Sequence, residues 1–125
     1  KIMNFRGIII EESLSDKAVL DKVKIVKTRI EKVTAKHKTP WISKWTLHTT
    51  EVKEADADMV ADLLNKAIDT SHKSSWYADF KNDKFHYIIF KDKIFKIKKN
   101  GSYKNARDWG LLMGIPEHQL DWKSI

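Results

Sequence analysis

The sequence predicts an α+β fold: a largely antiparallel sheet of five or six strands accompanied by two helices. Three observations predict it. Stretches of alternating or β-branched residues recur along the chain, two stretches carry apolar residues at helical spacing, and turn residues separate them. The expected order is three strands, a helix, three strands and a second helix, with both helices against one face of the sheet. We expect the 125 residues to form a single domain, residues 1–125.

The first half of the chain predicts three strands. Residues 5–11 contain a continuous β-branched run, which indicates a strand buried on both faces. Residues 17–35 are ambiguous: their apolar spacing indicates a helix, but their many β-branched residues favour a strand over about 24–34, with a bulge near Ile25 and Val26. If this segment is helical, the sheet loses one strand. After a turn at Pro40, residues 41–52 form a strand with Trp45, Leu47 and Thr49 on one face and Thr46, His48 and Thr50 on the other.

The second half predicts two helices and two hairpins. Residues 56–69 match the amphipathic helical template, and acidic residues lie in the first turns, where the helix dipole favours them. A shorter helix begins after Ser102 and ends at Gly114, because Pro116 prevents its continuation. The tail that follows is expected to pack back onto the body through Leu120 and Trp122.

The first hairpin, WYADFKNDKFHYIIF at residues 76–90, contains the main candidate site. A two-residue loop at Asn82-Asp83 would place Asp79 directly opposite His86, with Cβ atoms about 5 Å apart. Tyr77 lies on the same face, and His48 belongs to another strand whose position depends on the strand order. An Asp–His pair on a sheet face is more often a packing feature than a catalytic dyad, so both interpretations are kept.

A binding surface is predicted beside this pair. If the helices leave one sheet face partly open, Ile88 and Phe90 would form the floor of a pocket with His86. The candidate binding residues are Trp41, Trp45, Ile88, Phe90 and Lys96.

Composition restricts the class of function. The chain lacks cysteine, which excludes disulfides and a cysteine nucleophile and is typical of a reducing cytoplasm. No apolar run reaches the ~20 residues of a membrane span, so we expect a cytoplasmic protein without a membrane partner. The net charge is +7, but only three of the 24 basic residues are arginine, and spread lysines are typical of a solubilising surface. Nucleic acid is therefore a less favoured partner.

Three functions are carried forward. The favoured one is a small ligand- or partner-binding regulatory module, acting on an unidentified small molecule or protein and forming either a monomer or a homodimer. The first alternative is a hydrolase-type enzyme with His86 as general base, Asp79 orienting it, and Tyr77 or His48 assisting. The second is a nucleic-acid-binding protein using a lysine-rich face formed by Lys91, Lys96, Lys98, Lys99 and Lys104.

We expect no cofactor and no metal site. The five histidines form none of the local zinc signatures, such as HExxH. The weaker alternative is a metal site assembled from the distant residues His48, His72, His86 and Asp79.

Three stretches carry a resemblance to a known family. They are TPWISKWTLHTTEV at 39–52, SSWYADFKNDKFHYIIFKDKIFKI at 74–97 and GIPEHQLDW at 114–122. Together they resemble a family of short, uncharacterised prokaryotic proteins of about this length, over nearly the whole chain. The resemblance implies one self-contained α+β domain and carries no activity or functional residues.

Overall fold

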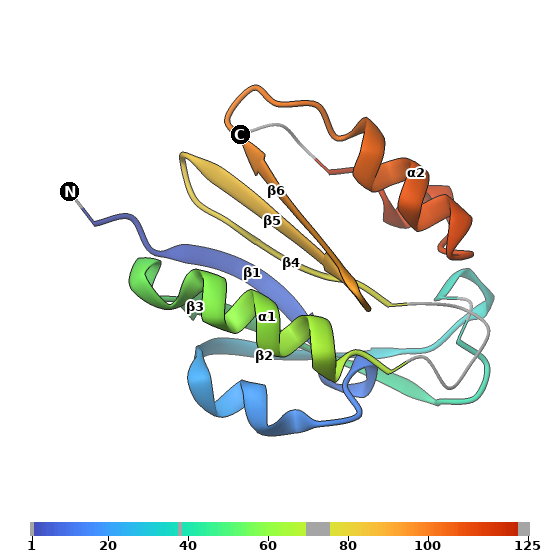
Figure 1. Ribbon diagram of the computed structural model, residues 1–125. Helices are drawn as coiled ribbons and strands as arrows, with labels where there is room; N and C mark the ends of the chain where they lie inside the picture. Colours follow the sequence, from blue (N-terminus) through green and yellow to red (C-terminus); the bar gives the residue numbers. More distant parts are fainter. Residues whose placement is uncertain (1, 38, 70–75, 123–125) are drawn as a thin grey trace.

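The computed structural model describes residues 2–37, 39–69 and 76–122 (Figure 1). The strands and α-helices are β1 (Phe5–Ile10), β2 (Lys24–Lys32), β3 (Lys44–Val52), α1 (Ala57–Ala67), β4 (Ala78–Lys81), β5 (Phe85–Phe90), β6 (Lys93–Lys98) and α2 (Lys104–Leu112). The predicted α+β class and the order of elements are confirmed. No helix among these residues is both long and apolar enough to cross a bilayer.

The six strands form one antiparallel sheet in the order β2-β3-β1-β4-β5-β6 (Figure 1). Strand β1 therefore lies in the middle, although it comes first in the chain. It joins β3 on one side and the later hairpin of β4 and β5 on the other. This order brings residues from the start, middle and end of the sequence onto neighbouring strands.

Gly7 allows the two halves of the sheet to join. Gly7 pairs with Phe80 across β1 and β4. A Cβ atom added at Gly7 would lie 1.8 Å from the carbonyl oxygen of Asp79 and 2.6 Å from Cα of Phe80. Both are backbone atoms of a central strand, which cannot move aside like a flexible side chain. The sheet therefore needs glycine at this position, and Gly7 also fixes the backbone that carries Asp79.

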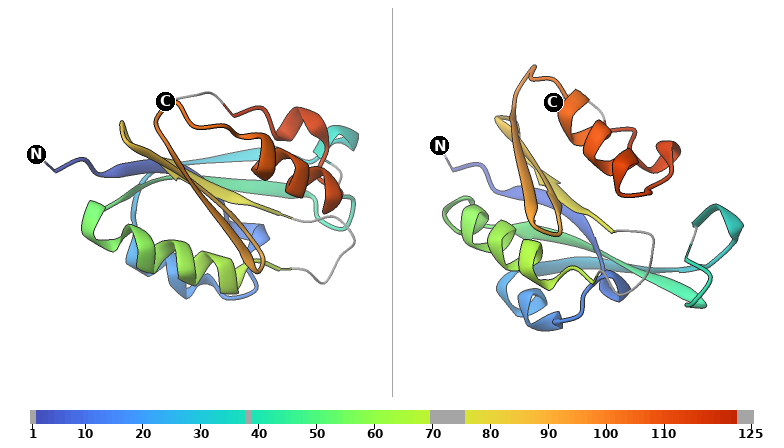
Figure 2. Two further views of the ribbon diagram at one scale, coloured as in Figure 1. Left: turned by 45° about the horizontal axis from the view of Figure 1, so that its top comes forward. Right: turned by 45° about the vertical axis from the view of Figure 1, so that its right-hand side comes forward.

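The two helices cover opposite faces of the sheet (Figure 2). On one face, Val60 and Leu64 of α1 belong to the main core. On the other, Tyr103 and Ala106, at the start of α2, belong to a second core that includes Ile88. The main core also contains Phe5, Ile9, Val52, Phe80, Tyr87 and Ile89, and the second core Phe90, Ile115 and Leu120. The prediction that both helices share one face is therefore wrong. Apolar residues alternate to both sides of β5, so each face needs its own cover.

Helix α2 covers the β5–β6 part of the sheet face on which it lies, and not the part formed by β1 and β3. Phe95 and Ile97 of β6 pack against this second core. Ile8 on β1, which faces the same way, remains 41% exposed. The prediction that β1 is buried on both faces is therefore wrong at Ile8, while Ile9 is fully buried beneath α1 as expected. One part of this face is left open, over β1 and β3.

The ambiguous segment at 17–35 forms strand β2, preceded by a 3₁₀ helix at Lys17–Lys22. The register shifts between Ile25 and Lys27, which confirms the predicted bulge. The second helix also follows its prediction: Ser102 Oγ accepts a hydrogen bond from the backbone N–H of Lys104, and Gly114 adopts φ 87° beyond the last turn. Leu120 is fully buried, so the tail packs back as expected.

The register of the first hairpin differs from the prediction. Asp79 pairs with Ile88, and His86 pairs with Lys81. The side-chain oxygen of Asn82 accepts hydrogen bonds from the backbone N–H groups of Lys84 and Phe85, at 2.8 and 2.9 Å. This local capping moves the turn by one residue. The pairing consequently shifts by two, so every side chain keeps its predicted face but Asp79 and His86 become diagonal neighbours.

We predict that Gly7→Ala lowers the free energy of unfolding by about 3 kcal/mol, because the new methyl group overlaps the backbone of β4. Urea denaturation followed by circular dichroism measures the change. A loss below about 0.5 kcal/mol would contradict the close approach of β1 and β4.

Candidate functional site

Asp79 and His86 form a hydrogen bond despite the altered register. Nε2 of His86 lies 2.6 Å from Oδ2 of Asp79. The two residues differ in environment: His86 is 1% exposed, whereas the side chain of Asp79 is 28% exposed. The pair therefore joins a buried imidazole to a carboxylate that solvent reaches.

Tyr103 extends this pair into a chain of three groups. Its hydroxyl lies 2.8 Å from Nδ1 of His86. Burial, and then the charge of Asp79, raise the pKa of the Tyr103 phenol, which keeps its proton. An ionised carboxylate only accepts hydrogen bonds. Nε2–H therefore donates to Asp79, and Nδ1 forms its hydrogen bond with the Tyr103 hydroxyl.

This geometry argues against His86 as a general base. Both ring nitrogens are engaged, and α2 and its neighbours enclose the ring. A base must reach the proton that it removes from a substrate. His86 instead orients Asp79. Of the three hydrogen-bonded groups, Asp79 is the one that a ligand can contact.

His48 lies on the opposite face of the sheet from Asp79. On β1, Ile9 pairs with His48 whereas the adjacent Ile8 pairs with Asp79, and successive residues of a strand point to opposite faces. His48 is 7% exposed, and its ring bonds to Thr28 and Glu11 at 2.8 and 2.9 Å. The structure therefore does not bring His48 to the Asp79–His86 pair.

The position of His48 on the opposite face also separates two members of the predicted metal site, His48 and Asp79. His72 lies outside the described residues. Within the part of the chain that is described, no three His, Asp or Glu side chains are grouped to hold a metal ion.

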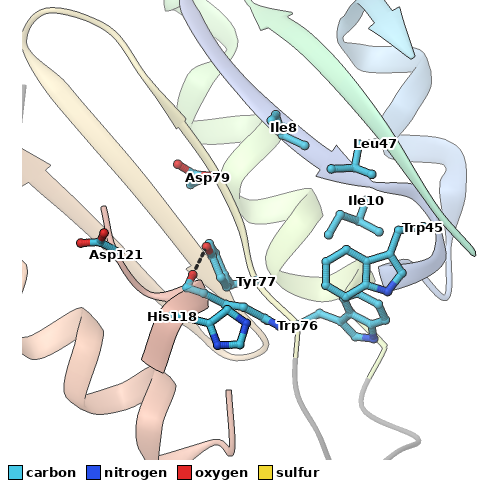
Figure 3. Close-up of a pocket in the computed structure, with 10 residues that line it drawn as sticks. Ile8, Ile10, Trp45, Leu47, Trp76, Tyr77, Asp79, His118 and Asp121 are labelled. Atoms are coloured by element: carbon cyan, nitrogen blue, oxygen red, sulfur yellow. Dashed lines mark hydrogen bonds between the residues drawn. The ribbon is translucent and has the colours of Figure 1, made fainter. Parts of the chain in front are cut away.

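A pocket of about 380 Å³ lies over the uncovered part of the α2 face (Figure 3). Its lining comes from β1, β3, β4 and the C-terminal segment, and consists of Ile8, Ile10, Trp45, Leu47, Trp76, Tyr77, Asp79, His118, Gln119 and Asp121. Apolar and aromatic side chains dominate, with a few polar groups among them. This volume and lining are typical of small-molecule sites, which range from about 300 to 1,000 Å³.

Hydrogen bonds hold the walls of the pocket in place. The Tyr77 hydroxyl donates to the backbone carbonyl of Gln119, which ties the C-terminal wall to β4 (Figure 3). Burial, and then the charge of Asp79, raise the pKa of Tyr77, so its proton remains available for this bond. On the other side, Nε1 of Trp45 donates to Oγ1 of Thr39 at 2.8 Å. The pocket is thus formed before any ligand arrives.

The sequence-predicted site residues are distributed over both faces. Tyr77, Asp79 and Trp45 line the pocket. Ile88 and Phe90 are almost fully buried in the second core, so they do not floor an open pocket. The other two candidate binding residues lie elsewhere: Trp41 packs against the main core, and the Lys96 ammonium lies over the rings of Phe85 and Tyr87.

Sequence reasoning missed most of the pocket. Its floor is Ile8 and Ile10 on β1 and Leu47 on β3, two and three strands away from the predicted floor on β5. Its far wall is His118, Gln119 and Asp121. The sequence did signal that β1 is apolar on both sides and that the tail packs back. The missing information was that β1 lies between β3 and β4.

Comparison with protein-family models, with curated proteins and with solved structures gives no match. The family resemblance of the three sequence stretches therefore stays a prediction, and function is inferred from the geometry of this pocket.

We predict that Tyr103→Phe lowers the free energy of unfolding by about 1–3 kcal/mol, because it leaves Nδ1 of the buried His86 without its hydrogen-bond partner. Tyr87→Phe is the matched control, since the Tyr87 hydroxyl donates to Asp58, whose side chain is 83% exposed. Urea denaturation of both variants gives the comparison. Equal losses of unfolding free energy would contradict the prediction, because the Tyr103–His86 bond would then stabilise the fold no more than the exposed Tyr87–Asp58 bond.

Glu11 provides a pH-dependent prediction. The hydrogen bond from His48 lowers the pKa of Glu11 below its ordinary value of 4.5. A lowered native pKa contributes stability that is present above pH 4.5 and is lost as the pH falls through the native value. We therefore expect Glu11→Gln to lose stability at neutral pH and to show a shallower decline below pH 4.5. Glu117→Gln, at an exposed position, should keep the wild-type profile. If the stability of wild type and of Glu11→Gln declines equally steeply below pH 4.5, the lowered pKa of Glu11 is contradicted.

Proposed function

We propose that this protein is a binding module that holds a small organic molecule in the pocket between β1, β3 and the C-terminal segment. The observation that carries the proposal is a preformed cavity of about 380 Å³ with an apolar floor on the sheet and polar groups at its edge. Apolar area removed from water supplies affinity, and the polar groups supply orientation. Fixed walls reduce the ordering cost of binding.

The alternatives receive less support from the geometry. A hydrolase built on His86 would need an accessible ring nitrogen, and His86 is buried with both nitrogens bonded. A nucleic-acid-binding face would need its lysines on one surface. Of the five lysines predicted for that face, Lys96 and Lys98 pair with Tyr87 and Phe85 on the α1 side of β6, whereas Lys104 lies at the start of α2, on the other side of the sheet. These lysines are thus divided between two faces.

A homodimer through the β2 edge of the sheet is also disfavoured. Strand β2 is one of the two edge strands, and it exposes Ile25, Val26 and Ile30. Its sequence KIVKTRIEK places a lysine or arginine at four of nine positions. Basic side chains along an edge oppose pairing with a second copy of the same strand. A small ligand is therefore the occupant that we favour over a second copy.

The neutral, polarity-sensitive dye prodan tests the pocket. We expect saturable fluorescence enhancement with the wild-type protein and about tenfold weaker binding by Ile8→Lys, which replaces part of the apolar floor with a charged chain. Ile30→Lys is the matched control, because Ile30 is 61% exposed and lies outside the pocket. Thermal unfolding checks that both variants fold. The absence of saturable binding, or equal weakening by both variants, would overturn the proposal.

A further inference from the structure

We infer that the pocket selects an organic cation, a protonated amine carried on an apolar or aromatic body. This inference rests on the proposed binding function and adds the chemical class of the ligand.

The charge of the pocket lining favours a cation. The chain has a net charge of +7, yet no lysine or arginine among the residues that the structure describes lines the pocket. The carboxylates in the lining are Asp79 and Asp121. The pocket is therefore acidic inside a basic protein. An anionic ligand would meet two like charges there, whereas a cation would meet two opposite ones.

Asp79 has one carboxylate oxygen available to a ligand. Its Oδ2 atom accepts the hydrogen bond from His86, and Oδ1 accepts none from any residue that the structure describes. The side chain is 28% exposed and lines the pocket. A partly sheltered carboxylate is most strongly stabilised by a charged donor. The bond from His86 holds Asp79 in one orientation, so a ligand ammonium group would find its partner already placed.

The aromatic residues of the pocket lie apart from its carboxylates. The rings of Trp45 and Trp76 lie 5.2 Å apart between centroids, at 56° to each other. In Figure 3 these rings lie on one side of the pocket, the two carboxylates lie on the other, and Tyr77 lies between them. Aromatic faces accept apolar bodies and also attract cations. The pocket thus has two ends, one for an apolar or aromatic group and one for positive charge.

Three ligands that share an indole ring test the class: tryptamine is a cation, tryptophol is neutral and indolepropionate is an anion at pH 7. We expect tryptamine to bind about tenfold more tightly than tryptophol, because a charge-assisted bond replaces a neutral one, and indolepropionate to bind most weakly. Chemical-shift titration of the ¹⁵N-labelled protein measures all three affinities. The indole N–H signals of Trp45 and Trp76 report on binding in the pocket.

Charge-removing variants locate the preference. Asp121→Asn and Asp79→Asn should each reduce the ratio of tryptamine to tryptophol affinity several-fold, while the affinity for tryptophol changes little. Asp121 is exposed, so its replacement leaves the fold intact even if Asp79→Asn weakens the contact with α2. Asp83→Asn, an equal change of charge in the hairpin loop and outside the pocket, should leave the ratio unchanged.

The outcomes separate the two proposals. If none of the three ligands binds, the cation inference is overturned, and the prodan titration decides separately whether the pocket function stands. If all three bind with similar affinity, the binding module stands and the cation inference is overturned. A preference for tryptamine that survives both Asp121→Asn and Asp79→Asn, or that Asp83→Asn reduces equally, also overturns the inference, since the preference would then reflect overall charge.

Discussion

The hydrogen-bonded chain from Tyr103 through His86 to Asp79 crosses the boundary between the covered and the open part of one sheet face. Tyr103 and His86 lie beneath the α2 layer, and Asp79 lies at the edge of the pocket. These hydrogen bonds thus join α2 to the sheet and fix Asp79, which contacts the buried His86 and also lines the pocket. Removing either polar partner of the buried ring would leave a nitrogen unsatisfied, at a cost of about 1–3 kcal/mol.

The pocket depends on the central position of β1. Gly7 permits the backbone of β4 to approach, which brings Asp79 beside Ile8. The C-terminal segment then closes the opposite wall through the bond between Tyr77 and the Gln119 carbonyl. Each part comes from a different region of the chain, so the site exists only in the complete fold. The apolar floor and the polar edge follow from the same register, because Ile8 and Asp79 are direct neighbours across the ladder.

The elements and their faces could be predicted because they depend on local periodicity. The alternation of Thr46, Leu47 and His48 along β3, the helical spacing in α1 and the stop at Gly114 are all readable within a few residues. The hairpin register failed for a local reason as well. The predicted turn rested only on the tolerance of Asn82 and Asp83 for positive φ. The Asn82 side chain instead accepts hydrogen bonds from two backbone N–H groups, and these bonds stabilise a different turn.

The location of the site could not be predicted, because it depends on strand order and on the face chosen by α2. Ile88 and Phe90 would form the floor of an open pocket if α2 lay on the other face. Because α2 covers their face, they are part of a core. The Asp79–His86 contact survived because a shift of two residues preserves the face. Its role changed, since burial of His86 leaves Asp79 as the accessible group.

The most direct test of this account is the orientation of tryptamine in the pocket, measured by intermolecular nuclear Overhauser effects. The account predicts contacts from the indole ring to Trp45 and Trp76, and contacts from the methylene group beside the ammonium to Ile8, which pairs with Asp79. Contacts in the reverse orientation, or contacts confined to residues outside the pocket, would contradict it.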